Sequence, residues 1–174
     1  MVADCGDCAA GAGFVVAVKA NGSVWLRGKA PAPTRLPSAG SGSWAEIGWA
    51  TTPAGAAVAV EACGGVVLVA TSERELFSCG SGIALGLETK GGVATLAPLS
   101  DLPPVCAFSV GSLHAACAGV DGSMWCWGDG LSGNLGTGTR KSCPSPVQVE
   151  LGSGERVVHI SCTRGQAMPK RLGK

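Results

Sequence analysis

The chain has 174 residues, a formal net charge of +1, 28 glycines and 46% hydrophobic residues. Because the net charge is near zero, the chain has no general attraction for nucleic acid. Frequent glycines beside a large apolar fraction favour a β-protein with a packed core. The longest candidate for a membrane segment, residues 54–60, is far too short to span a bilayer.

The first element expected is a β-hairpin near the N-terminus. Gly11 precedes an apolar run at residues 14–18, an Asn21-Gly22 turn follows, and a second strand ends at Gly28. Asn-Gly between apolar runs is a strong hairpin signal, because both residues tolerate the positive φ of a tight turn.

The same order of turns and strands recurs along the chain. In a weaker copy, Gly64 leads into an apolar run and Gly80 closes the following strand. Gly28, Gly80 and Gly128 close equivalent strands at intervals of about 50 residues, and residues 157–162 begin a fourth copy. Self-similarity at this period, with four short strands per unit, predicts the blades of a β-propeller.

The most complete copy has Gly111, then His114 three residues later, an Asp121-Gly122 turn, Trp-Cys-Trp-Gly ending at Gly128, Gly-x-Leu-Gly and Pro-x-Pro-Val. This pattern resembles the regulator of chromosome condensation repeat, whose members are seven-bladed propellers. The resemblance implies an all-β chain that forms part of such a propeller from four-stranded blades. The signature positions are Asn21, Gly22, Gly28, Gly64, Gly80, Gly111, His114, Asp121, Gly122, Trp127, Gly128, Gly133, Leu135, Gly136 and Pro146.

The length of the chain predicts an incomplete propeller, since about 50 residues per blade give about three and a half blades. Pro169 cannot donate to a sheet ladder, so we expect the fourth blade to stop at its inner hairpin. The chain is then a truncated product, a fragment or half of a split assembly, and its open edges favour pairing with another chain or with a second copy that closes the ring. We expect one domain over residues 1–174, with repeats at 10–57, 58–104 and 105–156, a truncated repeat from 157 and a basic tail at 169–174.

Nine cysteines cannot all pair within one chain. If Asp121 and Gly122 form a two-residue turn, Cys117 lies opposite Cys126 at a separation that suits a cross-strand disulfide. Secreted bacterial repeats that resemble this one often carry such cysteines. The alternative is two small buried hydrophobic side chains in a reduced protein.

Two motifs suggest cofactors but lack the context that these cofactors need. Cys5 and Cys8 have the spacing of a zinc or redox site, yet no second pair supplies further ligands. Residues 128–133 read Gly-x-Gly-x-x-Gly, but the glycines and prolines that follow cannot form the helix of a dinucleotide site. We therefore expect no metal and no cofactor.

The two histidines, His114 and His159, do not suggest a catalytic site. His114 occupies a repeat position that we align with Phe14, Val67 and Gln166, so a packed strand residue is expected rather than a base. His159 alternates with apolar residues in an opening strand. No catalytic residue is therefore predicted.

The function expected from the resemblance is a non-enzymatic protein-binding module, because the turns of such propellers bind other proteins, in some cases a small GTPase. The alternatives are guanine-nucleotide exchange on a Ran-like GTPase and a non-functional remnant. The N-terminal residues lack the basic flank and apolar core of a secretory signal, so we expect a cytoplasmic or nuclear location.

Overall fold

The computed structural model describes residues 5–29, 36–37, 42–89, 91–162 and 167–172, the last of these by backbone alone. The chain divides into two compact units. One comprises Met1–Gly82 with Thr89–Pro98, and the other comprises Ile83–Glu88 with Leu99–Lys174. No helix among the described residues is both long and apolar enough to cross a membrane.

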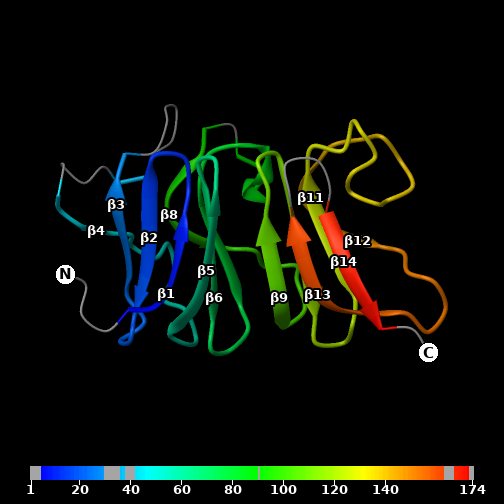
Figure 1. Cartoon of the computed structure of the whole chain (residues 1–174), viewed down its shortest axis with the longest axis horizontal. Helices are drawn as coiled ribbons and strands as arrows, with labels where there is room; N and C mark the ends of the chain where they lie inside the picture. The colour runs from blue at the N-terminus through cyan, green and yellow to red at the C-terminus, as the bar shows by residue number, and fades with distance from the viewer. Residues whose placement is uncertain (1–4, 30–35, 38–41, 90, 163–166, 173–174) are drawn as a thin grey trace. The chain divides into compact units, whose positions relative to one another are not determined.

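The first unit contains two four-stranded antiparallel sheets (Figure 1). Their strands, in sheet order, are β1 (Cys5–Ala10), β2 (Phe14–Lys19), β3 (Val24–Gly28) and β4 (Ala45–Glu46), then β5 (Ala57–Cys63), β6 (Val66–Thr71), β7 (Leu76–Gly80) and β8 (Val93–Pro98). One face of each sheet contributes to a shared core. Apolar side chains that alternate along the strands supply it, among them Val16 and Leu26 from the first sheet and Val67, Val69 and Phe77 from the second.

The second unit contains the third four-stranded sheet and a two-stranded one. Its elements are the short 3₁₀ helix η1 (Ile83–Leu85), β9 (Val105–Val110), β10 (His114–Gly119), β11 (Met124–Gly128), β12 (Cys143–Val149), β13 (Arg156–Cys162) and β14 (Ala167–Leu172). Val157 and Ile160 of β13 pack against one face of the third sheet, where Ala116, Met124 and Cys126 are buried. The small alanines of β10 allow the two sheets to approach closely.

The all-β fold class is confirmed, and the three four-stranded antiparallel sheets are those of propeller blades. Two expected boundaries differ. The first sheet begins at Cys5, earlier than residue 10, because β1 pairs with β2. Residues 169–172, which we expected in a tail, lie within β14.

The predicted two-residue turn at Asp121-Gly122 is wrong. Gly119 N–H donates to Ser123 O at 3.0 Å, and Gly122 N–H donates to Gly119 O at 2.9 Å, so the loop has three residues. Gly122 has a φ of 87°, whereas the other central residues of this loop do not have positive φ. A type I turn followed by a left-handed residue matches strand twist as well as the two-residue turn does.

The three-residue loop shifts the strand register by one residue. Cys117 pairs with Trp125, and Cys126 pairs with Ala116. Because directly opposed residues share a face and neighbours alternate, Cys117 and Cys126 point to opposite faces of the sheet. The cross-strand disulfide that a two-residue turn would allow therefore lacks its geometric basis, and both thiols are free.

Pro169 lies inside β14, where it pairs with Ile160. This is the register position that Cys117 holds in β10. In β10 the N–H of Gly119 points to β11 and donates to Ser123 O. The N–H of Cys117, two residues earlier, points to the same side of the strand. The missing N–H of Pro169 therefore falls on the side of β14 away from β13, which is where proline is tolerated in a sheet.

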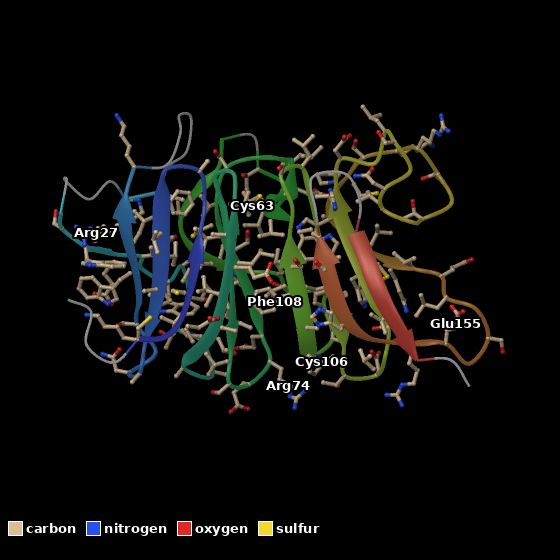
Figure 2. All side chains as sticks on the ribbon, viewed as in Figure 1. Arg27, Cys63, Arg74, Cys106, Phe108 and Glu155 are labelled. Carbon is tan, nitrogen blue, oxygen red and sulfur yellow. The ribbon has the colours of Figure 1, made fainter. Side chains whose placement is uncertain are left out.

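Arg74 holds the left-handed position of the β6–β7 turn (Figure 2). Its φ is 65°, and Arg74 N–H donates to Thr71 O at 2.9 Å, as the glycines do in the equivalent turns. A non-glycine residue in this conformation costs about 1–2 kcal/mol. Arg74 is exposed, so the side chain gains no packing that offsets this cost.

We predict that Arg74→Gly raises the free energy of unfolding by about 0.5–1 kcal/mol, because relief of the strained φ exceeds the added entropy of the unfolded chain. Urea unfolding followed by circular dichroism measures the change. The matched control, Arg74→Ala, removes the same side chain but keeps the strain and leaves stability within about 0.5 kcal/mol. Equal effects of the two substitutions would refute the assignment of strain to this residue.

Candidate interaction site

The end of β11 forms a rigid corner around Trp127. The indole of Trp127 is 0% exposed, and its Nε1–H donates to the carbonyl oxygen of Ala84 at 2.8 Å. Ala84 lies in η1, so this bond ties a segment from the β7–β8 connection to the third sheet. The bond is buried, and it satisfies two polar groups that would otherwise be costly.

The chain leaves this corner through Gly128, which has a φ of 109°. A Cβ atom at Gly128 would collide with the carbonyl oxygen of Leu113. The same carbonyl accepts a hydrogen bond of 2.7 Å from the N–H of Asp129. The turn before β10 and the loop after β11 are therefore held side by side, and only glycine fits between them.

The loop of residues 129–142 is clamped at its base. One oxygen of Asp129, Oδ1, accepts hydrogen bonds from Ser142 Oγ at 3.0 Å and from Leu131 N–H at 3.3 Å. Gly130 N–H donates to Ser142 Oγ at 3.2 Å. The clamp joins the two ends of the loop, so the loop is ordered before any partner binds.

A second set of contacts fixes the middle of the loop. Asn134 Nδ2 lies 3.3 Å from Nδ1 of His114, the first residue of β10, and Leu135 is 1% exposed within the core. His114 is thus packed in its strand and holds the loop. The register pairs His114 with Gly128 and Val66 with Gly80, so the equivalent residue in the second sheet is Val66; our alignment with Val67 is wrong by one position.

With its base and middle fixed, the loop leaves a defined group of side chains exposed. Leu131 is 68% exposed and Leu113 is 52% exposed. Arg140 and Lys141 are also exposed. The carbonyl of Lys141 packs directly against Gly130, where a Cβ atom would collide with it. The backbone of Lys141 therefore lies beside Gly130, the residue that precedes Leu131. We call Leu113, Leu131, Arg140 and Lys141 the loop surface.

Most of the other signature residues lie at turns and strand ends, and Pro146 lies within a strand. Asn21 and Asp121 accept hydrogen bonds from Ser23 and Ser123, which follow two residues later. Gly111 N–H donates to His114 O. Gly22, Gly28, Gly64, Gly80, Gly122, Gly128, Gly133 and Gly136 have positive φ, and Pro146 lies in β12. They shape the turns and form no catalytic cluster.

The two motifs that suggested cofactors do not form a cofactor site in the described part of the chain. Cys5 and Cys8 both lie in β1 and are exposed. Among the described residues, no group of three or more His, Cys, Asp or Glu side chains could hold a metal ion. Gly133 lies in an irregular loop, and no helix follows it within residues 134–149.

A shallow hollow of about 570 Å³ lies at the opposite end of the third sheet, and its lining includes Asp121, Glu150 and Glu155. The pKa of Asp121 is held below its ordinary value, mainly by hydrogen bonds from the hydroxyl and N–H of Ser123. The Asp121 carboxylate therefore stabilises the β10–β11 turn.

Most of the loop surface and its supporting contacts have no signal in the sequence. Asp129 and Ser142 are 13 positions apart and follow no periodic rule, and the pairing of His114 with Asn134 depends on how the loop folds back. The Gly-x-Leu-Gly motif was the one available signal, because its buried leucine, Leu135, is what draws the loop onto the sheet.

The family model of the regulator of chromosome condensation (RCC1) repeat matches residues 121–168. Residues 121–168 form a regulator of chromosome condensation repeat. The matched segment begins at the β10–β11 turn and ends in β14, so one sequence repeat joins the outer strands of one blade to the inner strands of the next.

Curated relatives and solved structures agree with this repeat. A segment of the chain is 38% identical over 58 residues to the human E3 ubiquitin-protein ligase HERC2, which is 33% of this chain and 1% of the ligase. Yeast RCC1 (Prp20), solved bound to Kap60, superposes with a TM-score of 0.79 at 15% identity over 96% of this chain and 42% of its own. Human WBSCR16 superposes with a TM-score of 0.76 at 20% identity, over 93% of this chain and 43% of its own. The chain spans less than half of these propellers.

We predict that Trp127→Phe lowers the free energy of unfolding by about 1–3 kcal/mol, because the buried carbonyl of Ala84 loses its donor while the aromatic packing is largely kept. Chemical denaturation measures the difference. Trp125→Phe is the matched control. It removes an indole bond to Ser123 that is only part-buried, and we expect a change within about 0.5 kcal/mol. Equal losses of stability in the two variants would show that the buried bond to Ala84 contributes no more than the part-buried bond to Ser123.

We predict that thiol reactivity divides the cysteines by burial. Burial raises the pKa of Cys126 to about 12, with a smaller effect from Cys162, and burial also raises the pKa of Cys79 and Cys117. Because the thiolate is the nucleophile, iodoacetamide at pH 8 should alkylate the exposed Cys5, Cys8 and Cys106. The buried Cys79, Cys117 and Cys126 should stay unmodified until the protein unfolds. Peptide mass spectrometry reads the sites. A linked Cys117–Cys126 peptide would contradict the register.

Proposed function

We propose that the chain is a non-enzymatic protein–protein interaction module built from regulator of chromosome condensation repeats. The supporting observation is the loop of residues 129–142, which is clamped by Asp129 and Ser142 and pinned by His114 and Asn134 while its apolar and basic side chains face solvent. A rigid loop on a rigid sheet costs little conformational entropy on binding. The proposed partner is therefore another protein.

An alternative function is guanine-nucleotide exchange on a Ran-like GTPase. The similarity to a yeast structure favours it, because the work on that structure describes the binding of Prp20p to Gsp1p and histones. This similarity has a TM-score of 0.75 at 15% identity and covers 44% of that chain. Exchange by residues from several blades would then need more blades than the three four-stranded sheets of the described residues.

We propose a cytoplasmic or nuclear setting, which the buried, unlinked thiols of Cys79, Cys117 and Cys126 support, because such thiols persist in reducing compartments. Under this proposal Cys117 and Cys126 act as small hydrophobic side chains.

The two functions predict different results in a nucleotide-release assay with a Ran-like GTPase loaded with fluorescent GDP. If the chain is a binding module, the release rate stays within about twofold of the spontaneous rate at saturating chain. If it is an exchange factor, release accelerates by about a hundredfold or more, since such catalysis stabilises the nucleotide-free GTPase. Full-length yeast RCC1 is the positive control. Hydrolytic or redox turnover of a substrate by the pure chain alone would overturn the proposed non-enzymatic function.

A further inference from the structure

The loop surface combines an apolar pair with a basic pair. Leu113 and Leu131 are joined through Asp129, whose N–H bonds the carbonyl of Leu113 and whose carboxylate accepts from the N–H of Leu131. Both leucines are more than half exposed, although their backbones are fixed. Large apolar side chains held rigidly in water favour an interface.

The charges at this surface are one-sided. Arg140 and Lys141 are exposed, and neither makes an ion pair among the described residues. The carboxylate nearest in sequence within the loop is Asp129, and it faces inward to the hydroxyl of Ser142 and the N–H of Leu131. A partner that contacts this loop would therefore meet positive charge as well as apolar carbon.

The backbone of the loop offers little for strand pairing. Its N–H groups at Gly130, Leu131, Gly133 and Gly136 already donate within the loop. These four positions are therefore closed to a partner strand, which favours recognition by side chains.

We propose that the loop surface binds an acidic peptide segment of another protein, with one apolar side chain packed between Leu113 and Leu131 and flanking carboxylates paired with Arg140 and Lys141. This inference rests on the proposed binding function and names the chemistry of the partner. Charge pairs at the rim steer association and fix the register of the segment, while the apolar contact provides most of the affinity.

A display selection tests the proposal. The intact chain is immobilised and used to select from a library of random peptides, and the recovered peptides are synthesised and their affinities measured by fluorescence anisotropy. We expect peptides that carry an apolar residue flanked by carboxylates. Leu131→Ser and the double variant R140E/K141E should each weaken binding by about tenfold or more. The effect of the charge reversal should shrink as salt rises.

Two matched variants serve as controls. Val158→Ser removes another exposed apolar side chain of the same unit, and Arg27→Glu reverses another exposed arginine. Neither should change the affinity of the selected peptides. Unfolding midpoints equal to that of the parent chain show that all variants remain folded.

Other outcomes overturn the inference. These are selection of no peptides, selection of peptides without carboxylates, or affinities that the controls change as much as the loop variants do. Light scattering that shows a dimer dissociated by Leu131→Ser would assign the surface to a second copy. Binding of a fluorescent single-stranded DNA that is lost in R140E/K141E would assign it to nucleic acid. If the peptides bind elsewhere on the chain, the binding function stands and only this inference fails.

Discussion

One backbone contact governs all three four-stranded sheets. Gly28, Gly80 and Gly128 end equivalent strands with φ values of 108°, 107° and 109°. At each of them a Cβ atom would collide with a carbonyl oxygen just before the second strand of the same sheet. That carbonyl accepts a hydrogen bond from the residue after the glycine in every case. The chain can therefore turn out of the sheet only where a side chain is absent, which places a glycine at the same point in each blade.

The residue before each of these glycines decides what the corner does. Arg27, Cys79 and Trp127 hold the same register position in their sheets. Arg27 is exposed and Cys79 is buried, whereas Trp127 is buried and also donates to the carbonyl of Ala84. Within the part of the chain that the structure describes, only the third sheet uses this position to bind a separate segment by a side-chain hydrogen bond. The three corners therefore share one backbone geometry, and in the third sheet the Trp127 side chain also holds a separate segment in place.

The sequence predicts the blades better than it predicts their details. The glycines that close strands repeat because the turn forbids a Cβ atom, so their spacing alone indicates the strands. The hairpin register could not be derived from Asp121-Gly122, because the same dipeptide suits a two-residue and a three-residue loop and these differ by one position. The clamp between Asp129 and Ser142 could not be derived either, since it depends on the path of a loop with no period.

The register error has a physical consequence for the cysteines. With Cys117 and Cys126 on opposite faces of one sheet, each thiol packs into a different apolar environment, and Cys126 lies beside Ala116 and Ile160 in the core of its unit. Small side chains at these positions let the sheets approach, and an alanine or a serine would change either the volume or the polarity. Cysteine combines small size with apolar character, which accounts for its use in the interior without a disulfide. The rigidity of the loop surface therefore rests on packing and hydrogen bonds, and it does not require an oxidising compartment.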